Sequence, residues 1–156
     1  MELRKHIVLS IASLLAAAGL AAATAATPAI ASEDRIQPLT TENQWYDFYF
    51  AYPGATQGTY GVPKEDDTAS WITVTNMTMY DLELYIDGGT YQSGPWINCT
   101  VGGSAYLVDP GDWWIHNVVY ENNYGYARLT GWCDDETGDL EGYWSPDSWG
   151  TYPSLN

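Results

Sequence analysis

A period of two in the apolar residues limits the possible folds of this chain more than any other feature. Within residues 80–87, Leu82, Leu84 and Ile86 alternate with polar and aromatic side chains. Successive side chains of a β-strand point to opposite faces, so this spacing places the three apolar residues on one buried face. After residue 31, no segment has apolar residues at helical spacing over a dozen positions. The pattern predicts an all-β protein.

Seven further segments alternate in a similar way, and turns rich in Gly, Pro, Asn and Asp separate them. The predicted strands span residues 44–52, 70–77, 80–87, 96–101, 104–108, 113–120 and 124–133, with a short last strand that ends at 142–148. The two-residue gap before residue 80 suggests a hairpin, and residues 53–68 are predicted to form a long surface loop. We expect one domain over residues 44–156, an antiparallel β-sandwich or small barrel of about eight short strands.

Residues 1–31 have the composition of a helical secretory signal peptide that is cleaved from the mature chain. Arg4 and Lys5 make a basic start, residues 7–20 are apolar, and small residues at 29–31 form a cleavage signal. Cleavage after residue 25 or 26 is the alternative. Residues 32–43 are polar and are predicted to be a flexible N-terminal segment. Because no second apolar segment follows, we expect a secreted, extracellular protein without stable membrane insertion.

The mature chain is strongly acidic. Residues 32–156 keep three basic residues, Arg35, Lys64 and Arg128, against 19 acidic ones. Nucleic acids and anionic membranes are bound through basic contacts to phosphate, so they would repel this chain. The charge therefore excludes nucleic acid as a partner, and other polyanions unless a divalent cation bridges them. The charge is also typical of a soluble extracellular protein, and it leaves the oligomeric state open.

Cys99 and Cys133 are the only cysteines of the chain. Both fall on the apolar side of their predicted strands. An exported chain meets an oxidising environment, so we expect a buried disulfide between them. The chain-entropy argument gives such a bridge about 3.5–4 kcal/mol of stabilisation. A redox or metal role would need a closer pair or more ligands.

Aromatic residues are unusually frequent, with eight Trp, thirteen Tyr and two Phe. Trp and Tyr offer flat apolar platforms with a polar edge, which suit the faces and hydroxyls of sugar rings. The alternation places one group of rings on outer faces, as candidates for a ligand-binding platform: Trp45, Trp71, Trp96, Trp114 and Tyr143. The alternative is that these rings form cross-strand pairs and part of the core.

Carboxylates are concentrated in residues 134–141, around a glycine. Calcium binds about six to eight oxygen ligands, and this loop offers several at short spacing: Asp134, Asp135, Glu136, Asp139 and Glu141. The spacing differs from that of the twelve-residue helical calcium loop, and a solvated acidic turn is the alternative. Calcium is the one cofactor that the sequence suggests.

The sequence does not indicate an enzyme. His116 is the one histidine outside the leader, and it has no evident Ser or Cys partner for nucleophilic catalysis. Paired carboxylates could cleave a glycoside, but 19 acidic residues would place two within reach by chance. We therefore expect no catalytic residues and no enzymatic activity.

Arg128 lies in the middle of the predicted strand 124–133. A guanidinium group can bind a carboxylate through two parallel hydrogen bonds. We expect a structural ion pair that joins the last strands, with one of three acidic residues as the partner: Glu121, Glu141 or Asp147.

Two motifs near the C-terminus resemble those of a family. Residues 126–129 read Tyr-Ala-Arg-Leu, and residues 142–148 read Gly-Tyr-Trp-Ser-Pro-Asp-Ser. They are similar to the ending of small secreted β-rich proteins of Gram-positive bacteria whose function is unknown. The similarity covers about the last 40 residues. It implies export and an all-β fold, and it transfers no catalytic or binding residues. The two cysteines and the high Trp content are not part of the pattern.

These features favour a secreted, non-catalytic binding or interaction domain, with a glycan or another cell-envelope component as its ligand. A secreted bacteriocin-like or signalling effector is the first alternative, although such peptides are usually cationic. A small glycan-active enzyme is the second alternative. It would need a cleft with two carboxylates about 5–10 Å apart beside an aromatic wall.

Overall fold

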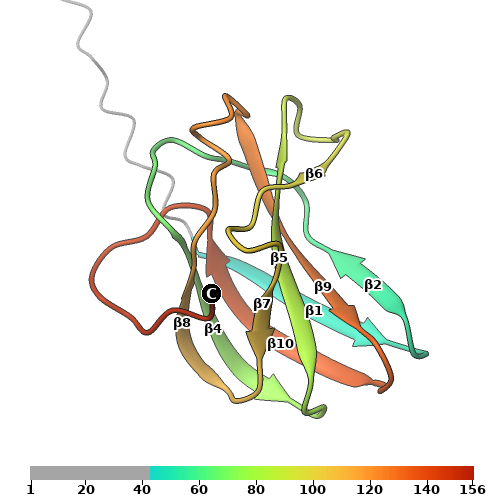
Figure 1. The fold of residues 1–156 in the computed structure, drawn as a ribbon. Coiled ribbons are helices and arrows are strands. Elements are labelled where there is room, and N and C mark those ends of the chain that lie inside the picture. Colours follow the sequence, from blue (N-terminus) through green and yellow to red (C-terminus); the bar gives the residue numbers. More distant parts are fainter. Residues whose placement is uncertain (1–42) are drawn as a thin grey trace, which may run out of the picture. The chain divides into compact units, whose positions relative to one another are not determined.

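The structure is a computed structural model, and it describes residues 43–156. The predicted signal peptide, residues 1–31, and nearly all of the predicted flexible segment, residues 32–43, lie outside the described residues. In the described part, all regular elements are β-strands, as the alternation predicts (Figure 1). Residues 43–156 contain no helix of the length and hydropathy needed to cross a bilayer.

The described chain forms ten strands in two antiparallel sheets. The strands are β1 (Gln44–Phe50), β2 (Ala55–Gly58), β3 (Val62–Pro63), β4 (Ser70–Met77), β5 (Leu82–Gly89), β6 (Ile97–Asn98), β7 (Ala105–Leu107), β8 (Gly111–Ile115), β9 (Tyr126–Cys133) and β10 (Gly138–Ser145). Sheet A has the order β1-β10-β4-β8. Sheet B has the order β2-β9-β5-β6, with β3 also paired to β9 and β7 to β5.

The two sheets pack face to face and bury one apolar core, so the fold is a sandwich and is not closed into a barrel. In sheet A, β1 buries every second side chain. In sheet B, β5 and β9 do the same with aliphatic residues. The inward-facing set includes Tyr46, Phe48, Phe50, Ile72, Val74, Leu82, Leu84, Ile86, Leu129 and Trp144, all less than a tenth exposed. Apolar burial of this kind contributes most of the stability of a domain.

The structure has more strands than the eight that the sequence predicts, because the predicted loop 53–68 contains β2 and β3. Both strands pair with β9 at the edge of sheet B. Neither has a period of two over its few residues, so the sequence carries no strand signal there. Their backbone hydrogen bonds to β9 define them.

The predicted hairpin between 70–77 and 80–87 is wrong, because β4 belongs to sheet A and β5 to sheet B. The residues between them turn a corner of the sandwich, where Met79 is 3% exposed. A short connection suits a hairpin and a corner equally well, and alternation within each strand does not distinguish them.

Alternation fails as a guide to burial where a strand ends. Tyr52 continues the alternation of Tyr46, Phe48 and Phe50, which predicts an inward side chain, but β1 ends at Phe50 and Tyr52 is 65% exposed. Ile97 and Val101 alternate with Cys99 in the predicted strand 96–101, which predicts one shared buried face, yet both are exposed, since β6 spans only two residues. Likewise, the predicted strand 113–120 ends at residue 115.

A bulge in β10 sets the direction of the residues that follow it. The register between β10 and β4 shifts between Glu141 and Gly142. A Cβ atom at Gly142 would collide with the carbonyl oxygen of Thr73, and Tyr46 Oη donates a hydrogen bond of 3.1 Å to that same oxygen. Only glycine allows so close a backbone approach. The bulge therefore positions Tyr143 and the residues up to Ser148.

Candidate binding site

Four of the five predicted platform residues share the outer face of sheet A. Trp45 on β1 lies opposite Tyr143 on β10, and their ring centroids are 4.9 Å apart in an edge-to-face arrangement. Both rings are open to solvent, with exposed fractions of 51% and 40%. Trp71 on β4 lies opposite Trp114 on β8. Residues directly opposite in an antiparallel pair point to the same side, so the sheet presents two adjacent rows of aromatic side chains.

The C-terminal segment 151–156 covers the second of these rows. The backbone N–H of Trp114 donates to the carbonyl of Pro153 over 2.8 Å, and the N–H of Leu155 donates to the carbonyl of Trp114 over 3.0 Å. Tyr152 packs between Trp71 and Trp114, with centroid distances of 6.1 Å to each. Both tryptophans are half-buried for this reason.

The Asn156 side chain fastens the end of the same segment. Its amide nitrogen donates to the carbonyl oxygens of Val101 and His116 over 2.8 and 3.0 Å, and its amide oxygen accepts from the N–H of His116. β8 is the outermost strand of sheet A, so its second edge has no neighbouring strand. These bonds supply hydrogen-bond partners to the backbone directly after it. The last residues are thereby held at the side of sheet A.

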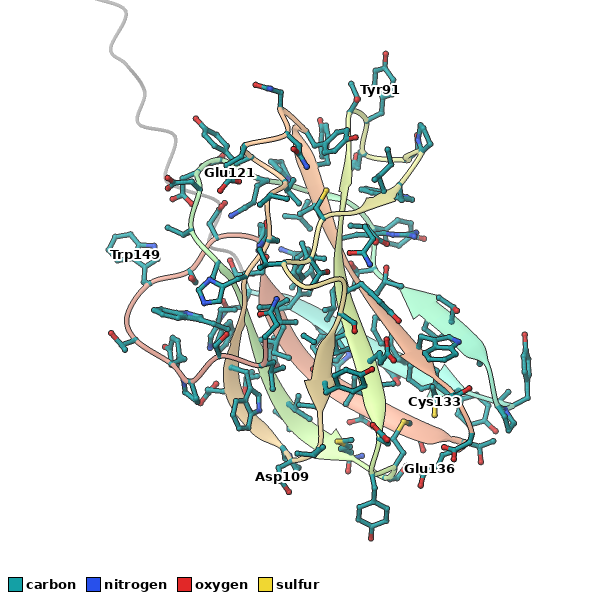
Figure 2. The ribbon with its side chains drawn as sticks, in the orientation of Figure 1. Tyr91, Asp109, Glu121, Cys133, Glu136 and Trp149 are labelled. Atoms are coloured by element: carbon teal, nitrogen blue, oxygen red, sulfur yellow. The ribbon has the colours of Figure 1, made fainter. Side chains whose placement is uncertain are left out.

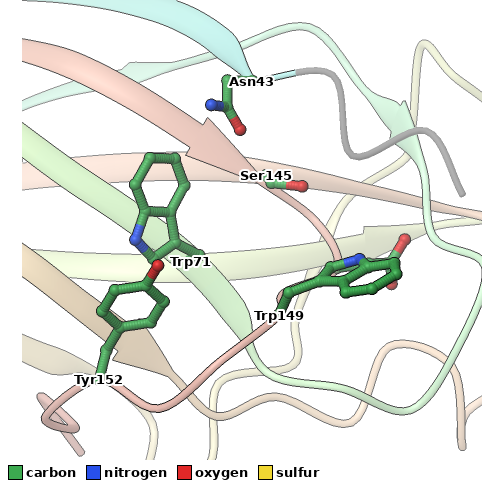
Figure 3. A pocket seen from close by; sticks show the side chains of 6 residues that line it. Asn43, Trp71, Ser145, Trp149 and Tyr152 are labelled. Atoms are coloured by element: carbon green, nitrogen blue, oxygen red, sulfur yellow. The ribbon is translucent and has the colours of Figure 1, made fainter.

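A pocket of about 190 Å³ opens beside this segment, and its lining comes from both ends of the described chain: Asn43, Trp71, Ser145, Asp147, Trp149 and Tyr152. Figure 3 shows Trp71 and Tyr152 on one side of the space and Trp149 on the other, with Asn43 and Ser145 between them. Trp149 is 69% exposed and projects from the loop after β10 (Figure 2). The pocket thus has aromatic walls and a polar base.

Two polar atoms at this pocket have no partner within the described residues. Ser145 Oγ and Trp71 Nε1 are both buried and make no hydrogen bond to the protein. Ser145 is 2% exposed. A buried hydroxyl without a partner is destabilising by about 1–3 kcal/mol, and such groups are rare in folded proteins. A bound hydroxyl or carbonyl group would satisfy Ser145 Oγ.

An ion pair closes the inner wall of the pocket. Lys64 Nζ lies 2.6 Å from Asp147 Oδ1, and each side chain is 1% exposed. Lys64 Nζ also donates to the carbonyl oxygens of Thr68 and Pro146 over 2.6 and 2.9 Å. Asp147 accepts from the backbone N–H groups of residues 65 and 66. The pair is therefore fully hydrogen-bonded, as a buried ion pair must be.

Further hydrogen bonds tie the segment before β4 to the end of β10. Ser70 Oγ donates to the carbonyl of Pro146 over 2.9 Å, and Asn117 Nδ2 donates to Ser70 Oγ over 3.1 Å. The N–H of Ser148 donates to Thr68 Oγ1 over 3.1 Å. The Trp-Ser-Pro-Asp-Ser motif is thus a structural junction between the two sheets, and it places Ser145 at the pocket.

Burial and hydrogen bonding shift the pKa values of two carboxyl groups of this junction in opposite directions. Burial raises the pKa of Asp147, although Lys64 and the N–H of Glu65 act to lower it. Burial also acts to raise the pKa of Asp66, but hydrogen bonds from the hydroxyl and N–H of Thr68, with smaller effects of Asp147 and Lys64, lower it overall. Neighbouring carboxyl groups that interact in this way share their protons unequally.

The fifth predicted platform residue, Trp96, has a structural role in sheet B. Its ring fills a space between three glycines, and a Cβ atom at Gly61, Gly89 or Gly94 would lie within 3 Å of it. The guanidinium carbon of Arg128 lies 4.9 Å from the ring centroid. Trp96 is half-buried and does not join the aromatic face of sheet A.

Arg128 forms an ion pair, and its partner is Asp87 instead of Glu121, Glu141 or Asp147. Nε of Arg128 lies 3.0 Å from Asp87 Oδ2, which also accepts a hydrogen bond of 2.7 Å from Thr130. Asp87 and Arg128 are directly opposite on β5 and β9. The sequence does not show that β9 pairs with β5, so Asp87, 41 positions away, was not among the candidates.

The predicted disulfide is wrong: Cys99 and Cys133 are free and buried. The N–H of Cys99 binds the carbonyl of Ile86, whereas Cys133 Sγ lies 4.0 Å from the carbonyl of Asp81. Asp81 directly precedes β5 and Ile86 lies within it, so these two points are about 16 Å apart at the usual rise per residue of a strand. A disulfide needs Cα atoms within about 7 Å. Figure 2 shows Cys133 beside Glu136, at one end of the sandwich.

The carboxylates proposed for calcium do not converge. No group of three or more acidic, His or Cys side chains within residues 43–156 is arranged to hold a metal ion. Glu136 accepts from the N–H of Tyr80, and Glu141 accepts from the Asn76 side chain. Asp139 and Glu141 lie within β10, because the strand begins at Gly138. Asp134 and Asp135 likewise belong to no such cluster within residues 43–156, and calcium binding stays a prediction.

Sequence reasoning identified Trp71 and missed the other pocket residues. Trp149 and Tyr152 lie in a tail without alternation, and Asn43 precedes the first strand. One signal was available: Lys64 is one of three basic residues after residue 31, and Asp147 stands in the C-terminal motif. Their pairing across 83 positions follows only from the fold.

Comparison with known proteins identifies one protein family whose sequence pattern matches this chain. Neither the curated proteins nor the solved structures include a significant match to this chain. A family of proteins of unknown function, DUF2712, matches residues 38–148, which extend from the segment before β1 through the Asp147 junction. Since the match covers more than half of the chain, the protein belongs to the DUF2712 family of unknown function.

Proposed function

We propose that the protein is a secreted, non-catalytic binding domain that holds one neutral sugar ring of an extracellular or cell-envelope glycan. The observation that carries this proposal is the pocket of Trp71, Trp149 and Tyr152, whose base contains the unpartnered hydroxyl of Ser145. Aromatic faces suit the apolar C–H faces of a sugar, while its hydroxyls need polar partners.

The size and polarity of the pocket support a single neutral ring. Its volume of about 190 Å³ is well below the roughly 300–1,000 Å³ of pockets for drug-sized ligands. Asn43 and Ser145 provide neutral hydrogen-bonding groups, and Lys64 neutralises the one carboxylate in the wall. With a formal net charge of −15, the chain disfavours an anionic ligand.

Neighbouring rings can extend the contact beyond one sugar. Trp45 and Tyr143 lie on the same outer face of sheet A as Trp71, one row further along the strands. Alternate residues of a strand are about 7 Å apart, so the exposed pair lies near the pocket. A chain of sugars could rest on both, with a terminal or internal ring in the pocket.

Export supports an extracellular ligand. Residues 1–31 have the features of a signal peptide, and the C-terminal motifs are similar to those of secreted proteins of Gram-positive bacteria. The effector alternative fits less well, because the chain is strongly acidic and envelope-active peptides are usually cationic. The enzyme alternative needs two free carboxylates at the site, and Asp147 is held by Lys64.

The test is a binding titration. We expect soluble neutral oligosaccharides, among them fragments of chitin and cellulose, to change tryptophan fluorescence, and insoluble peptidoglycan, chitin or cellulose to retain the protein. Trp149→Ala should weaken binding by tenfold or more, because it removes one aromatic wall. Ser145→Ala should weaken it about tenfold, since one hydrogen bond is lost.

Matched variants separate binding from folding. Trp149 is 69% exposed, so its removal should leave the melting temperature unchanged. Trp149→Phe should retain most of the affinity, and Trp132→Phe on sheet B should retain all of it. Affinity that is equal in the Trp149→Ala variant and the wild type would contradict the proposed site, and intact oligosaccharides after long incubation are the expected result for a non-catalytic domain.

A further inference from the structure

The junction between Lys64 and Asp147 has the composition of an amide-forming site. An amine and a carboxyl group lie 2.6 Å apart, and each side chain is 1% exposed. The carboxyl group of Asp66 lies 3.8 Å from the same amine. Two charges are costly in such surroundings unless they are neutralised. Moving one proton from the amine to a carboxylate converts the ion pair into a neutral amine and a carboxylic acid, the reactive forms for condensation.

We propose that Lys64 and Asp147 condense within the folded domain to form an intramolecular isopeptide bond, with Asp66 as the proton carrier. The neutral Nζ attacks Cγ of the protonated Asp147 carboxyl group, and an Nζ–Cγ bond forms. Asp66 accepts a proton from Nζ and delivers it to the departing hydroxyl. The Cγ–O bond breaks and one water molecule leaves. The step consumes no oxidant, reductant or cofactor.

The backbone around the pair positions both reactants. The carbonyl oxygens of Thr68 and Pro146 accept hydrogen bonds from Nζ and hold it beside the carboxyl group. The N–H groups of Glu65 and Asp66 lie 3.2 and 3.4 Å from the two Asp147 oxygens. Donors placed in this way stabilise the negative charge that develops on oxygen during attack at a carboxyl carbon. Fixed proximity of this kind is equivalent to effective concentrations of about 10⁵–10⁸ M.

Exclusion of water favours the amide over its hydrolysis. Ser70, Asn117 and Ser145, all less than a tenth exposed, surround the junction. The released water can leave through the adjoining pocket, because Asp147 also belongs to the lining of that pocket. Removal of water from the site shifts the condensation equilibrium toward the product.

The bond would be a covalent link between the two sheets. Lys64 directly follows β3 of sheet B, and Asp147 follows β10 of sheet A. The link would close a span of 83 positions in the sequence. The two cysteines in the described chain remain free, so this link would supply the covalent constraint that a disulfide often gives to a small exported domain.

The test is the mass and the lysine reactivity of the denatured full-length protein. The full chain contains two lysines, Lys5 and Lys64. We expect a mass that is lower than the sequence mass by one water molecule. We also expect Lys64 to resist an amine-specific label in denaturant, and trypsin to yield a branched peptide that joins the Lys64 and Asp147 segments. A cyclic imide at an aspartate would lose the same water, but it would leave Lys64 open to the label.

Three variants define the roles of the residues. Lys64→Arg keeps a positive charge but has no amine that can condense, so it should have the full sequence mass. Asp147→Asn should lose ammonia in place of water if it reacts. Asp66→Asn should leave a large fraction of molecules without the link. A wild-type protein of full mass with a labelled Lys64 overturns the proposal, and complete linkage in the Asp66→Asn variant overturns the role of Asp66.

Discussion

Lys64 and Arg128 form ion pairs in contrasting surroundings. Lys64 pairs with Asp147 where both side chains are 1% exposed. Arg128 pairs with Asp87 where the side chains are 27% and 10% exposed. The first pair joins two irregular segments from different sheets, and the second joins residues that are directly opposite within sheet B. The Arg128 guanidinium also contacts the ring of Trp96.

The difference shows how burial changes the contribution of an ion pair to the free energy of unfolding. A partly exposed pair exchanges water for a partner and contributes little. A buried pair is stable only when every donor and acceptor is satisfied, and removal of one partner leaves an isolated charge in an apolar site. The Lys64 junction meets this condition through backbone groups of the chain around it. The two ion pairs should therefore differ in their response to mutation, salt and pH.

The largest effect is expected for Lys64→Met, which leaves Asp147 buried without its partner. The variant should lose about 3–5 kcal/mol of unfolding free energy, as measured by urea titration. An amide bond between the two residues would increase the loss. The double variant Lys64→Met/Asp147→Leu should recover the part of the loss that comes from the unpaired Asp147 charge, because both charges are then absent. A loss no larger than that of an Arg128 variant would show that the two pairs are equivalent.

A smaller effect is expected for Arg128→Gln, since its pair is partly solvated. The loss should be about 1–2 kcal/mol, from the ion pair and from the contact with Trp96. About 1 M salt should reduce the loss, because exposed charges are screened. The same salt should leave the cost of Lys64→Met nearly unchanged. Equal salt dependence in both variants would contradict the contrast in burial.

The smallest effect concerns pH. Because the pKa of Asp66 is lowered on folding from its ordinary 3.8, its contribution is present above that value and is lost as pH falls through the folded pKa. In the Lys64→Arg background, which cannot form the proposed link and serves as the reference protein for this measurement, Asp66→Asn should therefore flatten the fall in unfolding free energy between about pH 4 and pH 2, by less than about 1 kcal/mol for this partly exposed group. The pKa of Asp147 is raised on folding, so its ionisation changes the pH dependence of stability in the opposite direction. The difference in unfolding free energy between the variant and its reference protein, followed against pH, therefore reports the contribution of the Asp66 carboxyl group.

The control for this measurement is Asp67→Asn, an exposed neighbour on the same segment. Urea midpoints of the two variants and the reference protein would be compared at pH 3 and pH 5. The control should follow the reference protein at both values. A profile of Asp66→Asn that is parallel to that of the reference protein would mean that its carboxyl group does not contribute through ionisation.

The fold class was predictable because its cause is local. Leu82, Leu84 and Ile86 are all buried as their alternation indicates. The strands β2 and β3 were not predictable, since their partner β9 defines them. The corner between β4 and β5 was missed for a similar reason: a short connection is compatible with one sheet or with two.

The candidate site was predictable only in part. Trp71 and Trp114 were assigned correctly to an outer face, but the tail that carries Tyr152 has no periodic pattern. The two cysteines were assigned correctly to the core. Nothing in their positions along the chain indicated that they lie at separate levels of β5. Alternation predicts on which face of a strand a side chain lies. It does not predict which residue of the neighbouring strand lies opposite that side chain.

The alternation that makes strands, the acidic charge and the abundance of aromatic rings are all properties of the linear chain. Each of these depends on residues close together in the chain or on composition alone. The tertiary structure decided which side chains meet: Lys64 with Asp147, Arg128 with Asp87, and Trp71 with Tyr152. The physical reason is that these contacts depend on the order and register of strands in two sheets, which hydrogen bonding and core packing select only when the whole chain has folded.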